Sequence, residues 1–299
     1  MKKKSVFAIA VVMATALGVW AQQPVSVTTA YGQFTFDATV STERYLGQKL
    51  RGAIVNNTTK DWVDLEFAII YYDSYGHKVD ALIGNTIRVA ELKKGASYAL
   101  GHGSGEIILI RGAGKGETPI GHYEVSLKEG TIPAKYTFAL LKKTLVKTGK
   151  PSIAESSDLA FSDDLTGFVF SISKRQFGFV LQNKTDEPIE IDWNKVAFVD
   201  VIGASHKVMH SGVKYIGRNE PLAPTTIPPS AKLEDIVFPS DYVYYSEGKY
   251  GGWTEVPLFP DGDKALAFKG QTFTVFMPVR VNGIVKNYSF KFKITDVAL

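Results

Sequence analysis

Apolar and polar residues alternate with a period of two along most of the chain. The clearest segment is 287–294, where Tyr, Phe, Phe and Ile hold the even positions and Asn, Ser and two Lys the odd ones. This alternation is typical of a half-buried antiparallel strand. Asn282-Gly283 separates it from an apolar segment at 272–281, and Asn-Gly favours the type I′ turn of a hairpin. The pattern therefore predicts an antiparallel hairpin at the C-terminal end.

A second pair of strands is predicted near the middle of the chain. Residues 123–127 and 136–140 each alternate between apolar and polar side chains, and Lys128-Glu129-Gly130 between them is typical of a turn. Helical periodicity is weak throughout. The pattern therefore predicts an all-β protein made of antiparallel strands.

An internal repeat divides the chain into two similar halves. Three positions recur at a constant spacing of 127 residues: Asn56 with Asn183, Asp73 with Asp200, and Gly76 with Gly203. Two copies are too few for a solenoid, so two complete domains of one type explain the repeat better. The Asn and Asp side chains suit turns that they close by bonding nearby backbone, and the glycines supply a positive φ. We interpret all six residues as structural turn residues and not as catalytic or metal-binding groups.

The repeat and the alternation together predict two tandem antiparallel immunoglobulin-like β-sandwich domains. We place them at residues 23–145 and 160–299. The segment 146–159 between them is polar and rich in turn-forming residues, as expected of a linker.

The first 21 residues are predicted to be a cleavable signal peptide. A short basic start, Met1-Lys2-Lys3-Lys4, precedes a mostly apolar run, and Val19-Trp20-Ala21 suits cleavage before Gln22. An uncleaved membrane anchor is the alternative. No later segment reaches the length of a membrane span, so no transmembrane span is expected after cleavage. The predicted location is the periplasm, the cell envelope or the extracellular medium.

Composition narrows the classes of function further. The chain has 34 basic and 30 acidic residues, a net charge of +4, and three of the lysines lie in the predicted signal peptide. A nearly neutral mature chain argues against nucleic-acid binding. Cysteine is absent, which excludes disulfides, thiolate metal sites and a cysteine nucleophile.

The motifs that resemble catalytic or metal sites are incomplete. The glycine-rich segment 112–116 lacks the Ser or Thr that follows the Lys of a phosphate loop, and Ser104 lacks the glycine spacing of a nucleophile elbow. His206 and His210 lie about 13 Å apart if they share a strand, too far to bind one metal ion. Asp261-Gly262-Asp263 lacks the remaining ligands of a calcium loop. We therefore predict no catalytic residue, cofactor or metal; a hydrolase built on Ser104 or the histidines is a less favoured alternative.

The first half resembles the FxLYD-type domain of exported bacterial proteins over about residues 45–140. The residues that carry the resemblance are Gly52, Val55, Asn56, Ile69-Ile70-Tyr71-Tyr72-Asp73 and Gly76. Ile69 stands where the family has Phe, and Tyr71 where it has Leu. The resemblance implies an immunoglobulin-like sandwich in an exported protein, and it implies no catalytic residues. The second half resembles β-rich domains of uncharacterised bacterial envelope proteins.

One long segment, 217–263, combines prolines and glycines with many aromatic residues. Aromatic side chains with a polar tip, held on a loop shaped by proline, are typical of recognition surfaces. The predicted partner-contact residues are Tyr242, Tyr244, Tyr245, Tyr250, Trp253 and Phe259. The alternative is that these rings cover a sandwich edge or pack between the domains.

The sequence thus favours a non-enzymatic, exported accessory or binding protein of the cell envelope. Its expected partner is a protein or a cell-wall glycan. A carbohydrate-binding module that acts through the segment 242–259 is the principal alternative. The oligomeric state and the identity of the ligand are not indicated by any motif.

Overall fold

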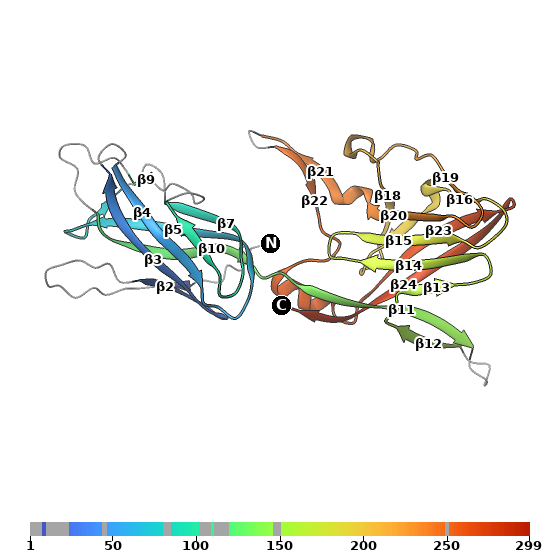
Figure 1. The fold of residues 1–299 in the computed structure, drawn as a ribbon, viewed down its shortest axis with the longest axis horizontal. Coiled ribbons are helices and arrows are strands. Elements are labelled where there is room, and N and C mark those ends of the chain that lie inside the picture. The colour runs from blue at the N-terminus through green and yellow to red at the C-terminus, as the bar shows by residue number, and fades with distance from the viewer. Residues whose placement is uncertain are drawn as a thin grey trace. The chain divides into compact units, whose positions relative to one another are not determined.

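The computed structural model describes residues 8–9, 24–43, 47–79, 85–101, 109–110, 120–145, 151–248 and 251–299. Most of these residues lie in strands, and every strand pairing is antiparallel, which confirms the all-β prediction (Figure 1). Contacts divide the chain into two compact units, Met1–Pro133 and Ala134–Leu299. Each unit is described separately below.

The first unit contains two antiparallel sheets that pack face to face. One sheet contains β2 (Val25–Thr29), β3 (Gly32–Glu43), β4 (Gly47–Asn56), β8 (Ser97–Leu100) and β9 (Leu109–Ile110). The other contains β1 (Ala8–Ile9), β5 (Trp62–Asp73), β6 (Lys78–Val79), β7 (Thr86–Leu92) and β10 (Ile120–Thr131). The Phe67 ring of β5 lies 5.3 Å from that of Phe34 and 5.0 Å from that of Phe36, both in β3. All three rings are fully buried, so the core lies between the sheets.

The second unit is dominated by one twelve-stranded sheet. Ten strands follow one another in it: β12 (Pro151–Ser156), β11 (Lys135–Leu145), β24 (Ile284–Ala298), β23 (Thr272–Val281), β17 (Ala197–Val199), β18 (Ser205–Met209), β20 (Lys232–Pro239), β15 (Phe177–Asn183), β14 (Thr166–Ile172) and β13 (Ala160–Ser162). Two more strands, β16 (Ile189–Ile191) and β19 (Thr225–Ile227), pair beside β23. Among the described residues of this unit, four 3₁₀ helices connect strands: η1 (Trp193–Lys195), η2 (Tyr215–Gly217), η3 (Ser240–Tyr242) and η4 (Gly262–Phe268).

This sheet curls until it is nearly closed. The Phe290 ring of β24 lies 4.7 Å from that of Phe168 and 4.8 Å from that of Phe170 in β14, although β24 and β14 are far apart in the strand order. A continuous aromatic core fills the interior. The predicted C-terminal hairpin is confirmed, because β23 and β24 pair directly, and Asn282 and Gly283 both have a positive φ at the turn.

The two units share one plan of strand pairing. In the first unit the order is β2-β3-β4-β8, and in the second it is β13-β14-β15-β20. In the opposite sheet, β10 pairs with β5, which also pairs with β6 and β7. In the second unit β23 pairs with β16 and β17, which pair in turn with β19 and β18. The helix η1 interrupts the counterpart of β5 and divides it into β16 and β17.

A buried asparagine occupies the same place in both units. Asn56 and Asn183 are fully buried, and each Oδ1 accepts hydrogen bonds from the backbone N–H and the hydroxyl of the threonine two residues on, Thr58 or Thr185. The carbonyls that accept from Nδ2 are those of Lys60 and Leu92 in the first unit, and of Glu187, Ile227 and Pro228 in the second. Each side chain therefore joins a turn to a distant strand end by satisfying buried backbone groups.

The Asp-x-x-Gly turns are also built alike. Asp73 Oδ1 accepts from the N–H groups of residues 75 and 77, and Asp200 Oδ1 from those of residues 202 and 204, all at 2.8–3.0 Å. Gly76 and Gly203 have φ of +83° and +86°, where a side chain would be strained. These are the structural roles that the sequence predicts for the four residues.

The boundary between the units differs from the sequence-based one. The sequence placed it at 146–159, whereas the units divide at Pro133, and β11 belongs to the second unit, where it pairs with β24 and β12. Lys128-Glu129-Gly130 does not turn the chain but lies within β10. A Cβ at Gly130 would lie 2.9 Å from Leu65 and 3.1 Å from Trp62, so this glycine permits a close approach of side chains. The alternation in 136–140 was correct, but its pairing partner was not.

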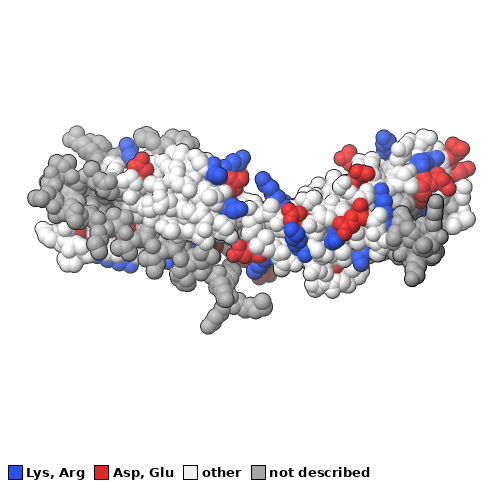
Figure 2. Space-filling view, turned by 90° about the horizontal axis from the view of Figure 1, so that it is seen from below, with Lys and Arg blue, Asp and Glu red and all other residues white. Residues whose placement is uncertain are grey.

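Charged residues of both signs are interspersed over the described part of the face in Figure 2. Several form ion pairs across strands, among them Lys293 with Glu155 at 2.5 Å and Lys286 with Asp163 at 2.8 Å. No helix in the described part of the chain has the length and apolar character needed to cross a membrane. The predicted signal peptide lies almost entirely outside the described residues.

Candidate contact surface

The aromatic segment of the second unit forms a small hairpin of its own. Strands β21 (Val243–Ser246) and β22 (Gly252–Glu255) pair only with each other, and they form a two-stranded sheet separate from the large one (Figure 1). The buried Val243 anchors the hairpin in the core, while Tyr244 and Tyr245, which follow it, are 48% and 57% exposed. The hairpin therefore presents aromatic side chains at the surface.

Trp253 is the centre of an aromatic cluster on this hairpin. Its ring lies opposite Tyr245 in the strand register, with 5.5 Å between the ring centroids and an edge-to-face angle of 73°. Tyr215 of η2 approaches it at 5.8 Å, also edge to face, and the Arg218 guanidinium lies 5.0 Å from its centroid. The Tyr215 hydroxyl bonds to the Glu255 carboxylate of β22. We call these five residues the Trp253 cluster.

Two predicted contact residues belong to the core or to its margin. Phe259 is fully buried, and its ring lies 5.2–5.3 Å from those of Tyr136, Phe138 and Phe273. The prediction that Phe259 contacts a partner is therefore wrong, because the chain returns to the core after β22. Tyr242, the last residue of η3, is half-buried and packs against the core. Of the other predicted residues, Tyr244, Tyr245 and Trp253 are exposed, and Tyr250 lies outside the described residues.

A charged cluster lies beside η3, the helix that directly precedes the hairpin. The His206 ring, only 11% exposed, has Nδ1 at 2.8 Å from Asp241 of η3 and Nε2 at 3.3 Å from Asp200. Burial of the ring opposes its charge, but the hydrogen bonds to both carboxylates outweigh burial and hold the pKa of His206 above its usual value. Because an ionised carboxylate can only accept, both ring nitrogens are satisfied only when the ring is protonated. The Tyr242 ring packs edge to face on His206 at 5.2 Å.

The two histidines do not act together. His210 stacks on Trp193 with 4.1 Å between the centroids and bonds to Asp235, whereas His206 bonds to Asp200 and Asp241. Within the described ranges, no group of three or more His, Asp or Glu side chains is arranged to hold a metal ion. Ser104 and the segment 112–116 lie outside the described residues.

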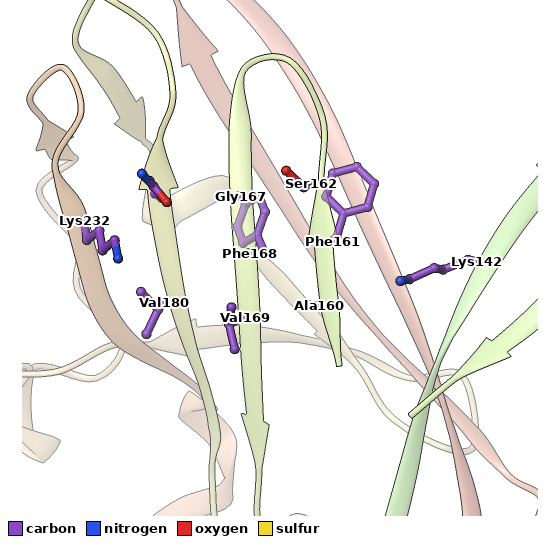
Figure 3. A pocket seen from close by; sticks show the side chains of 10 residues that line it. Lys142, Ala160, Phe161, Ser162, Gly167, Phe168, Val169, Val180 and Lys232 are labelled. Carbon is purple, nitrogen blue, oxygen red and sulfur yellow. The ribbon is translucent and has the colours of Figure 1, made fainter. Parts of the chain in front are cut away.

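The second unit also has an open groove of about 510 Å³ on its outer face (Figure 3). Val169 of β14 and Val180 of β15 form its apolar floor, and Lys142 and Lys232 lie at opposite sides of it. Lys232 belongs to β20, whose Glu234 pairs with Val180, so an acidic side chain lies next to that lysine. The groove is therefore a less distinctive surface than the Trp253 cluster.

Sequence reasoning missed three residues of the Trp253 cluster. Tyr215 precedes the segment 217–263, and Arg218 and Glu255 lie within it but are not aromatic. Alternate residues of one strand share a face, so a strand at 252–255 would have placed Glu255 on the same side as Trp253, but nothing in the sequence brings η2 to them.

Comparisons with known proteins add little to this picture. No family model matches the chain, and no curated protein matches it. Among solved structures, the chain is similar to the β-glucuronidase of Parabacteroides merdae, with 11% identity and a TM-score of 0.18. The match covers 81% of this chain and 27% of that one, so the chain spans about a quarter of its length. A likeness at this TM-score carries no argument about fold or activity.

Proposed function

We propose that this chain is a non-enzymatic binding protein of the cell envelope and that it contacts another protein through the Trp253 cluster. The apolar run that follows Met1-Lys2-Lys3-Lys4 supports an exported setting. The shared strand pairing of the two units supports an arrangement as tandem immunoglobulin-like sandwiches, with the first similar to an FxLYD-type domain.

The observation that carries this function is the composition of the exposed cluster. It joins Trp253, Tyr245, Tyr215 and Arg218, and these are the residue types that dominate the binding energy of protein interfaces. Arg218 over the indole and Glu255 on the Tyr215 hydroxyl fix the rings in place before binding. Such preorganisation lowers the entropy lost on association.

Crosslinking with mass spectrometry on the native envelope fraction tests the proposal. We expect a protein partner to crosslink at residues 243–255 in the wild type and to be lost from Trp253→Ala/Tyr245→Ala. Tyr75→Ala is the matched control, because Tyr75 is an 81% exposed tyrosine of the first unit. Unchanged thermal unfolding must accompany the loss. Retention of the same crosslinks in the double variant would contradict the proposal.

A glycan ligand is the second candidate. Tyr244 and Tyr245 expose about half of their surface, and exposed aromatic faces stack on sugar rings. Sedimentation with insoluble cell-wall glycan distinguishes the two candidates. Retention of the wild type and loss of Tyr244→Ala would favour the glycan over the protein partner.

A further inference from the structure

The strands β10 and β23 hold equivalent places in the two units, but their outer edges differ. Both pair on one side with the counterpart strands β5 and β16/β17. On its other side β23 pairs with β24 at all ten of its positions. On the corresponding side of β10, the described residues provide only two partners, Ala8 and Ile9 of β1. Most of the twelve-residue edge of β10 thus has no neighbouring strand within the described part of the chain.

The strand that would close this edge by sequence order belongs to the other unit. β11 follows β10 along the chain as β24 follows β23, and its residues alternate in the same way. It pairs instead with β24, from Lys135 opposite Ala298 to Leu140 opposite Phe292, and with β12 on its other side. The described part of the first unit therefore contains no counterpart of β24.

The position next to β10 that an added strand would occupy has an apolar side and a polar side. Tyr123, Val125 and Leu127 of β10 point into the core and are at most 8% exposed, whereas Glu124 and Lys128 between and beyond them are exposed. In the opposite sheet, β2 lies near β1 and contributes the buried Val25 and Val27. A strand added here would face an apolar core on one side and solvent on the other.

We propose that the edge of β10 beside β1, most of which has no partner strand among the described residues, binds an extended segment of a partner polypeptide as an added antiparallel strand. Main-chain hydrogen bonds to an exposed edge give such complexes their affinity, and alternate side chains give them specificity. The partner segment is expected to alternate between apolar and polar residues, because β24, which pairs with the corresponding edge of β23 in the second unit, alternates in this way. Cleavage of the predicted signal peptide would remove Ala8 and Ile9, so that a partner strand could pair with this edge of β10.

The register of the added strand follows from the repeat. Tyr123 pairs with Tyr71 as Val275 pairs with Phe198, and Tyr71 and Phe198 are separated by the repeat spacing. In the second unit Phe276, next to Val275, pairs with Ser289. A peptide with the sequence of residues 287–296 is therefore expected to place its Ser289 position opposite Glu124.

The first test is fluorescence anisotropy with that peptide carrying a dye at its N-terminus. We expect binding to residues 22–299 to be tighter than binding to the full chain, in which β1 occupies part of the edge. Two N-methylated versions of the peptide are matched controls. In one version the methyl groups block the backbone N–H groups along one edge of the extended peptide, and in the other version they block those along the opposite edge. One version is expected to bind at least about tenfold more weakly, since several backbone hydrogen bonds are lost. Equal binding of both versions and the parent peptide would overturn the proposal, as would absence of binding to either chain.

A disulfide crosslink locates the site, and the absence of native cysteine makes it specific. Glu124→Cys is expected to form a disulfide with a peptide that carries Cys in place of Ser289. Thr274→Cys, on the strand β23 that β24 already covers, is expected not to do so. Equal yields from both variants would place the peptide elsewhere and refute the proposal. Disulfide dimers of Glu124→Cys without peptide would instead identify a second copy as the occupant, which also refutes it. Because this site lies in the first unit, failure here leaves the Trp253 cluster untested and unaffected.

Discussion

The two units keep the same strand order, buried asparagine and aspartate turn, and they differ in how each sheet ends. The second unit surrounds its core with a nearly closed sheet that includes β11 and β24. The first unit stops at β10, whose outer edge meets only β1 among the described residues. The comparison separates the features that both copies of the repeat share from those that are found in one copy alone. Turn chemistry is common to both copies, whereas edges and insertions distinguish them.

The largest effect on stability is expected from truncation of a core side chain, which tests whether the two units unfold independently. Phe259→Ala removes a fully buried ring whose centroid lies within 5.3 Å of those of Tyr136, Phe138 and Phe273. We expect it to lower the free energy of unfolding of that unit by about 3–5 kcal/mol. Hydrogen exchange read by mass spectrometry is expected to quicken in β23 and β24 and to stay unchanged in β3 and β5. Equal acceleration in both units would show that they unfold as one.

Substitution of the buried asparagines tests the turn structure that the two units share. Asn56→Ala and Asn183→Ala each leave a threonine N–H and at least two carbonyls without their partner. We expect each change to cost its own unit about 2–3 kcal/mol. Thermal unfolding and local hydrogen exchange of both variants provide the measurement. A cost confined to one unit would show that the repeated asparagine has different roles in the two.

The histidines that follow the two turns sharpen the comparison through pH. His206 is nearly enclosed by Asp200 and Asp241, whereas the His77 side chain is 79% exposed beside Asp73. Since the folded pKa of His206 is raised above its usual 6.5, its contribution to stability is complete below that pH and is lost as pH rises through the raised pKa. We expect the second unit to lose stability on alkaline titration and His206→Gln to remove that dependence. Denaturant unfolding of the second unit between pH 6 and 9 measures it, and a pH profile of His206→Gln as steep as that of the wild type would contradict the expectation.

The smallest stability effect is expected at the surface cluster. Trp253→Ala removes a ring that is 39% exposed and contacts two tyrosines and an arginine. We expect a loss of at most about 1 kcal/mol, because exposed aromatic and cation–π contacts are individually weak. Differential scanning calorimetry against Tyr75→Ala checks this. A loss as large as that of Phe259→Ala would assign Trp253 to the core.

Local turn chemistry was the most predictable part of the fold. Asp73, Asp200 and the glycines after them act within a few residues of their own position, so their roles follow from the sequence alone. The C-terminal hairpin was predictable for the same reason, since Asn282-Gly283 specifies its turn. Strand pairing over long distances was less accessible. The alternation in 136–140 shows which side of β11 is apolar, but it contains no signal for pairing with β24 instead of β10.

The contact surface could be predicted only in part. Composition indicated the aromatic segment and three of its exposed rings, Tyr244, Tyr245 and Trp253. It could not separate these from Phe259, because a core ring and a surface ring have the same local sequence pattern when the chain re-enters the core. The contribution of Tyr215 and Arg218 depends on where η2 lies in space, which periodicity does not report.

The pairing of β11 with β24 also determines how the second unit responds to tension. Lys135, where the chain enters β11, lies opposite Ala298, next to the end of the printed sequence. A force applied between the first unit and Leu299 would therefore pull both strands from the same end of their ladder. The hydrogen bonds of an antiparallel ladder lie perpendicular to the strands, so they would break one after another and not all together. Under stretching, the second unit should begin to open at this seam at low force, before its aromatic core is disturbed.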